Sequence, residues 1–94
     1  MANITLRIKK KYFDLILDGQ KTIEYRAQKF YYTRMFQRGD DIKTLTLHYQ
    51  SPRKLRADVV SIRLIETPLW ILEDGSFDIG PFCYAIALIN PKLI

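Results

Sequence analysis

The chain has 94 residues, of which 48% are apolar and 13% aromatic, which is enough for one small folded domain and argues against intrinsic disorder. No apolar run approaches the roughly 20 residues of a membrane-spanning helix, the N-terminus lacks an apolar signal core, and the lone Cys83 leaves no internal disulfide. The net charge of +5 is concentrated in residues 1–38, where nine Lys or Arg accompany three acidic residues, and such a basic half favours a polyanionic partner.

These features predict a single domain over residues 1–94 of a cytoplasmic protein that contacts no membrane. Cys83 lies between Phe82 and Tyr84 in an apolar run, so we expect a buried, unreactive thiol. One thiol cannot form a zinc site alone, and His48 has no second histidine to complete a metal pair. We therefore expect no metal and no other cofactor.

The first part of the chain changes its periodicity twice. Residues 3–9 alternate polar with apolar side chains, which is the pattern of a half-buried strand. Residues 10–18 carry apolar side chains at helical spacing before Gly19, a residue that can end a helix, and so predict a short helix packed on the sheet. Residues 21–27 are rich in β-forming residues and predict the second strand.

The second part of the chain is mostly β-like. Residues 29–38 are aromatic and basic without a strict period and lead into a Gly-Asp turn signal, so they predict a loop or a partial helical turn. Residues 42–49 alternate as a strand, and residues 55–65 form a longer β-run whose apolar phase slips, as a bulge or bend requires. Residues 68–81 predict a long connection, and residues 82–89 predict a buried final strand.

Together these elements predict a mixed α/β fold that is mostly β. The expected architecture is a small, closed or nearly closed barrel of about five or six strands, with one helix after the first strand. An open sheet covered by one helix is the alternative.

The segment from Gly19 to Arg26 presents an ammonium, a carboxylate and a guanidinium within six positions. Glu24 and Arg26 lie two residues apart on one face of a strand that we expect to be exposed, where the pair can orient a donor fork toward a planar or anionic ligand. Lys21 adds charge beside them. The alternative is a solvated ion pair worth under about 1 kcal/mol.

Gly19, Lys21, Glu24 and Arg26 reproduce the G-x-K-x-x-E-x-R signature of ASCH domains, and the chain resembles this family over nearly its whole length. The helix before Gly19, a Gly-Asp turn at residues 39–40 and an apolar final strand also match. The resemblance implies a PUA-like barrel associated with RNA. It also implies that Lys21, Glu24 and Arg26 line a cleft between the helix and the barrel.

Some proteins similar to this family are enzymes, and the resemblance extends to them in part. Amidohydrolases acting on N4-acetylcytidine have a catalytic set that resembles Lys, Thr and a distant Glu. Lys21 matches that lysine, whereas Glu24 stands in the position of the threonine. A lysine whose pKa is lowered by nearby Arg26 can serve as a base, with Glu24 positioning water. Other ASCH-like proteins are ribonucleases.

Further cations and aromatic rings extend the candidate nucleic-acid surface. Three consecutive lysines stand at the start of the predicted helix, where an anion would relieve their repulsion with the helix dipole. Residues 29–38 interleave rings with cations, as proteins that grip unpaired bases do, and residues 51–56 form a second basic cluster. The predicted nucleic-acid-binding residues are Lys9, Lys10, Lys11, Lys21, Glu24, Arg26, Tyr31, Arg34, Arg53 and Lys54.

The sequence thus supports an RNA- or nucleotide-binding module first. A small hydrolase acting on a modified nucleoside amide or on RNA, with Lys21 and Glu24 as catalytic residues, is the second hypothesis. A phage or regulatory protein-interaction domain is the third. His48 is expected on the polar face of its strand in a surface role, and Trp70 is expected to cap the barrel.

Overall fold

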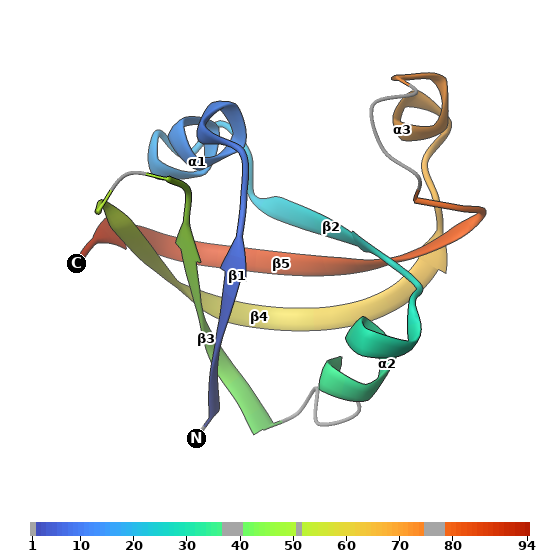
Figure 1. The fold of residues 1–94 in the computed structure, drawn as a ribbon, viewed down its shortest axis with the longest axis horizontal. Helices are drawn as coiled ribbons and strands as arrows, with labels where there is room; N and C mark the ends of the chain where they lie inside the picture. The colour runs from blue at the N-terminus through green and yellow to red at the C-terminus, as the bar shows by residue number, and fades with distance from the viewer. Residues whose placement is uncertain (1, 37–40, 51, 75–78) are drawn as a thin grey trace.

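The computed structural model describes residues 2–36, 41–50, 52–74 and 79–94 (Figure 1). The turn predicted at residues 39–40 lies outside the described residues. The elements in chain order are β1 (Ala2–Arg7), α1 (Lys10–Leu17), β2 (Ile23–Ala27), α2 (Phe30–Phe36), β3 (Ile42–His48), β4 (Lys54–Glu66), α3 (Leu69–Asp74) and β5 (Phe82–Leu93).

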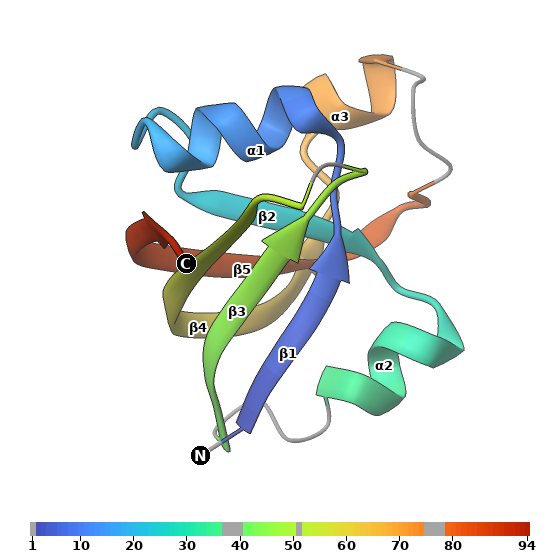
Figure 2. The same cartoon turned by 60° about the vertical axis from the view of Figure 1, so that its left-hand side comes forward.

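The five strands form one sheet in the order β1-β3-β4-β5-β2, with β1 and β2 at its two edges. β1 runs parallel to β3, and the remaining pairs are antiparallel. Long, curved β4 and β5 bend the sheet into a half-barrel (Figures 1 and 2). The predicted class, a mixed α/β fold that is mostly β, is confirmed. The sheet does not close into a full barrel through backbone hydrogen bonds, since the described residues of β1 and β2 do not pair with each other.

The bend in β4 was predicted from its slipping apolar phase. The pairing of β4 with β5 shifts register between Arg56 and Asp58 and again between Val59 and Ser61. An extra residue in one strand bends it and increases its twist. The bulge prediction is therefore confirmed, and the bend lets one long strand contribute to two parts of the half-barrel.

The predicted helix after the first strand is confirmed as α1, and the described residues contain two further short helices that the sequence did not predict as such. α2 occupies the segment predicted as a loop or partial turn, where Tyr32, Met35 and Phe36 recur at helical spacing and pack on the core. α3 lies in the predicted long connection after Pro68, whose carbonyl accepts hydrogen bonds from the amides of Ile71 and Leu72. Both helices are too short to form alone, so packing rather than propensity holds them.

The main core fills the concave side of the half-barrel. α1 lies across one end (Figure 2) and inserts Phe13 and Ile16, which are fully buried. Leu45 and Leu47 of β3 and Ile86 of β5 meet them from the sheet. This packing orients α1 and the residues that follow it toward β2.

A second, smaller core lies on the opposite face of the sheet, beneath α3. Cys83 is fully buried there with Ile71 and Ile79, and Tyr25 and Ile65 pack against them. The predicted burial of Cys83 is confirmed. Successive residues of β2 thus face different cores, because side chains alternate across a strand. Among the described residues, no helix is both long and apolar enough to cross a membrane.

Candidate functional site

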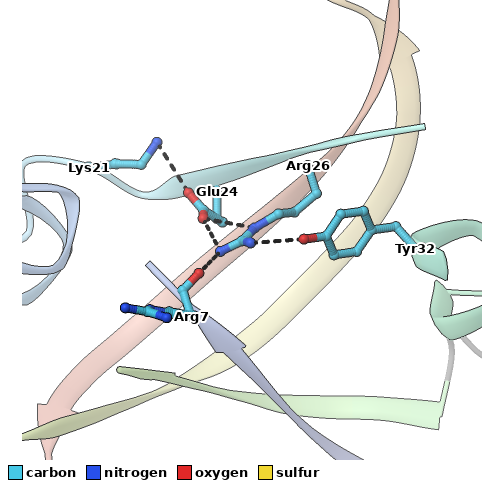
Figure 3. A network of polar contacts seen from close by, with 5 residues as sticks. All are labelled: Arg7, Lys21, Glu24, Arg26 and Tyr32. Atoms are coloured by element: carbon cyan, nitrogen blue, oxygen red, sulfur yellow. Dashed lines mark hydrogen bonds and ion pairs between the residues drawn. The ribbon is translucent and has the colours of Figure 1, made fainter. Parts of the chain in front are cut away.

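The motif residues Lys21, Glu24 and Arg26 form one connected polar network (Figure 3). Nε and Nη2 of Arg26 donate to Oε2 of Glu24 at 3.1 and 2.8 Å. Nζ of Lys21 lies 3.7 Å from Oε1 of the same carboxylate. One carboxylate therefore holds both cations, one on each of its oxygens.

The remaining donors of Arg26 tie the network to other elements. Nη1 donates to the hydroxyl of Tyr32 in α2 at 3.2 Å, and Nη2 donates to the carbonyl of Arg7 in β1 at 2.8 Å (Figure 3). The guanidinium is planar and its donors have fixed directions, so this set of partners sets its orientation. Arg26 is thus committed to contacts within the protein.

The expectation that Glu24 and Arg26 lie on an exposed strand face is wrong. Glu24 is only 6% exposed, and the side chain of Arg26 is 14% exposed. Alternation shows which side chains share a face, but the curled sheet turns this polar face inward, toward the cleft. A buried carboxylate is tolerated when it is paired and hydrogen-bonded, and Arg26 and Lys21 supply these partners.

Lys21 lies against two aromatic rings beside this carboxylate. Its Nζ is 5.6 Å from the ring centre of Tyr12 and 5.1 Å from that of Tyr25. Burial lowers the pKa of Lys21, the neighbouring charge of Glu24 opposes this shift, and Arg26 adds to it. The direction agrees with the sequence analysis, but desolvation rather than Arg26 is the main cause.

A cleft of about 1150 Å³ runs along this network, between the two sheet edges and the three helices. Among the described residues its lining is strongly basic, with six Lys or Arg side chains and one carboxylate, that of Glu24. It is also aromatic, with five tyrosines and Trp70. The charged and aromatic lining residues are Arg7, Lys9, Lys10, Tyr12, Lys21, Glu24, Tyr25, Arg26, Lys29, Tyr31, Tyr32, Tyr49 and Trp70.

Six of the ten predicted binding residues line this cleft, namely Lys9, Lys10, Lys21, Glu24, Arg26 and Tyr31. The other four predicted residues, Lys11, Arg34, Arg53 and Lys54, are exposed and are not among the lining residues.

Several of the lysines and arginines outside the network have partners of their own. Lys10 pairs with Asp14 at 2.7 Å, which offsets the unfavourable charge at the start of α1. The guanidinium of Arg53 lies 5.6 Å from the ring centre of Phe13. Lys54 opposes His48 in the β3–β4 ladder, and His48 is partly buried.

Most of the aromatic lining was not predicted from the sequence. Tyr12, Tyr25 and Tyr49 sit in segments with clear periodicity, where rings predict core packing, and each also borders the cleft. Trp70 was expected to cap the barrel, but it is 61% exposed and packs its ring edge-to-face on Tyr25 at 5.7 Å. The one signal for these residues is the abundance of tyrosine in a basic chain. No group of three or more metal-ligating side chains occurs among the described residues.

Comparison with known families identifies this arrangement. A family model for the ASCH domain matches residues 6–69, which run from the end of β1 to the first residue of α3 and include Lys21, Glu24 and Arg26. Comparisons with curated proteins and with solved structures gave no match. Because the match covers more than half of the chain, the chain belongs to the ASCH domain family, and the half-barrel is consistent with the fold of that family.

Proposed function

We propose that this protein binds single-stranded RNA or a nucleotide in the cleft beside Lys21. The observation that carries the proposal is the lining of the cleft, where six cations and six aromatic rings surround one carboxylate. Cations attract phosphates, and aromatic rings stack on bases. Membership of the ASCH family, a PUA-like module of the RNA-binding type, supports the same function.

Unpaired bases fit this lining better than a duplex does. Tyr31 and Trp70 border the cleft and are 64% and 61% exposed, so their rings are accessible to a stacking partner. Bases within a duplex are already stacked on each other, whereas single strands can splay their bases onto aromatic side chains. The proposed ligand is therefore a short single strand or a mononucleotide.

The network supports this function by positioning Lys21. Glu24 is buried, and Arg26 donates to Glu24, Tyr32 and the carbonyl of Arg7, whereas Lys21 has one carboxylate contact at 3.7 Å and donors to spare. In our proposal Lys21 contacts a phosphate or a base oxygen, and the pair behind it fixes its place.

A salt titration of RNA affinity tests the proposal. We expect the affinity for a short single-stranded RNA to fall steeply with salt, because cleft cations release counterions from the phosphates. Lys29→Ala removes an exposed cleft cation and should reduce the slope by about 1. Lys92→Ala removes an exposed lysine of β5 outside the lining and should leave the slope unchanged. Absence of binding at low salt would refute the proposal.

A second candidate function, hydrolysis of an acylated nucleoside amide, is favoured by the lowered pKa of Lys21 next to Glu24. A neutral amine can take a proton from water as it adds to the amide carbonyl, and the proton then passes to the leaving nitrogen as the C–N bond breaks. Incubation with N4-acetylcytidine tests this. Turnover that Lys21→Ala abolishes and Lys92→Ala preserves would establish it, and no turnover by the native protein would exclude it for this substrate.

A further inference from the structure

The backbone of β2 presents an unpaired edge to the cleft. Among the described residues β2 pairs only with β5, and in that ladder Thr22 stands opposite Leu88, whose amide donates to the carbonyl of Thr22 at 2.8 Å. In an antiparallel ladder hydrogen-bonded and non-hydrogen-bonded pairs alternate. Glu24 and Arg26 therefore direct their backbone groups toward β5, whereas those of Tyr25 point the other way, toward the open edge.

The free part of this edge is short. The carbonyl of Ala27 accepts a hydrogen bond from the amide of Lys29 at 2.9 Å. On β1, at the other edge of the sheet, the carbonyl of Arg7 accepts a hydrogen bond from Nη2 of Arg26. Ile23 also faces the open edge but is not among the cleft-lining residues. Within the described part of the chain, Tyr25 thus offers the cleft one N–H donor and one carbonyl acceptor for which the structure gives no backbone partner.

We propose that the backbone N–H and carbonyl of Tyr25 hydrogen-bond the edge of a single nucleobase. The inference rests on the proposed function and names the group that the cleft recognises. Each base carries a donor and an acceptor side by side on its Watson–Crick edge, and single-strand readers commonly bind that edge. One main-chain donor and one main-chain acceptor on the same side of a strand complement such an edge.

The side chains around Tyr25 suit the rest of a nucleotide. Trp70 packs on the Tyr25 ring and supplies an exposed aromatic surface, and the Lys21 ammonium lies 5.1 Å from the same ring centre. An aromatic ring stacks on a base, and an ammonium attracts a phosphate. A peptide strand added to the sheet would need several alternate residues with free backbone groups, and among the described residues of β2 that line the cleft only Tyr25 has both its N–H and its carbonyl without a backbone partner.

Matched nucleotides measure the base contact. We would determine the affinities of the four ribonucleoside 5′-monophosphates and of neutral analogues methylated on the same edge. These analogues are N3-methyluridine, N1-methylguanosine, N6,N6-dimethyladenosine and N4,N4-dimethylcytidine monophosphates. For the tightest-binding base, methylation should weaken binding by about 10-fold to 100-fold, because it removes one hydrogen bond and blocks the approach of the other. Ribose 5-phosphate measures the contribution of the phosphate alone.

Amide NMR of the native protein locates the contact. The Tyr25 amide resonance should move downfield on addition of the tightest nucleotide. The Glu24 and Arg26 amides serve as internal controls on the same strand, because their N–H groups point toward β5. Methylated analogues should leave the Tyr25 amide near its free position. Agreement of both measurements supports the proposal.

Other outcomes separate this inference from the proposed function. The inference is overturned if a nucleotide and its methylated analogue bind with equal affinity, or if binding does not shift the Tyr25 amide resonance. Either result would mean that the Tyr25 backbone does not bind the base edge, and it would leave the proposal of RNA binding in place. Absence of binding by every nucleotide and RNA overturns both. A shift of the Tyr25 amide caused by an extended peptide but by no nucleotide would assign the edge to a protein partner and overturn the inference.

Discussion

Arg26 joins the two edges of the sheet, because its Nη2 donates to the backbone carbonyl of Arg7 at 2.8 Å. Arg26 belongs to β2 and Arg7 to β1, the strands at opposite ends of the sheet order. A side chain therefore spans the opening that the backbone leaves in the half-barrel. The contacts of Arg26 with Glu24 and Tyr32 anchor this link to the rest of the fold.

Replacing Arg26 by Ala should lower the free energy of unfolding by about 3 kcal/mol, because the buried carboxylate of Glu24 loses its hydrogen-bonded partner. Urea unfolding measures this. Arg34→Ala, which removes an exposed arginine of α2, should change stability by no more than about 0.5 kcal/mol. If Arg26→Ala costs no more than its control, the network is the solvated ion pair considered in the sequence analysis.

Lys21 should make stability depend on pH in the alkaline range. Burial lowers its folded-state pKa below 10.5, so between the two values the unfolded chain binds more protons than the folded one. The cost of burying the ammonium is present in full below the folded-state pKa and is relieved as the pH rises toward 10.5. The native protein should thus gain stability relative to Lys21→Met over this window.

Urea unfolding from about pH 7 to about pH 10 checks this sign. Lys10→Met is the control, because the hydrogen bond and charge of Asp14 raise the pKa of exposed Lys10, so the native protein should show no such gain relative to it. A difference between native protein and Lys21→Met that stays constant with pH would contradict the lowered pKa of Lys21.

Trp70 should contribute to RNA affinity and little to the fold. It is 61% exposed and lines the cleft, so Trp70→Ala should weaken RNA binding by about 1 to 3 kcal/mol through the loss of base stacking. Leu69 is 67% exposed on the same helix but outside the lining, and Leu69→Ala should leave affinity unchanged. Fluorescence titration of a labelled RNA distinguishes the two, and equal losses would place the ligand elsewhere.

Cys83 should react with a thiol reagent only when α3 moves away. Its side chain is fully buried against Ile71 and Ile79, and an inaccessible thiol reacts slowly. Ile71→Ala leaves a cavity next to the thiol and should accelerate labelling measurably, whereas Leu72→Ala, at a more exposed position of α3, should not. Labelling of the native protein as fast as that of the urea-unfolded chain would show that the second core is open.

Periodicity predicted the strands well because each strand has one face on a core. Residues 42–49 and 55–65 were placed within one or two residues of β3 and β4. Periodicity could not show that both faces of β2 are covered, one by the main core side of the sheet and the other by α3. Glu24 and Tyr25 are neighbours in sequence, yet Glu24 belongs to the buried polar network and Tyr25 packs against the second core under α3. Which face is exposed depends on how the sheet curls and on where α3 docks, and these are tertiary properties.

The motif was the most informative local signal for the site. The remaining residues that line the cleft belong to segments far from the motif in sequence. Lys21, Glu24 and Arg26 lie close in sequence, so their proximity could be predicted. Tyr49, directly after β3, and Trp70, in α3, reach the same cleft, and no spacing in the sequence connects them. The short helices α2 and α3 were missed for the same reason, since they are stabilised by the surfaces on which they pack.

The strand order has a consequence for the time at which the cleft forms. β2 pairs only with β5, matching Ile23 with Ala87, and β1 pairs only with β3. Contacts between residues so far apart close long loops and form slowly. During synthesis the described residues of β2 have no ladder partner until β5 has left the ribosome. The basic N-terminal segment therefore becomes an ordered cleft only after β5 has been made, and ligand binding in the cleft would report that β2 and β5 have paired.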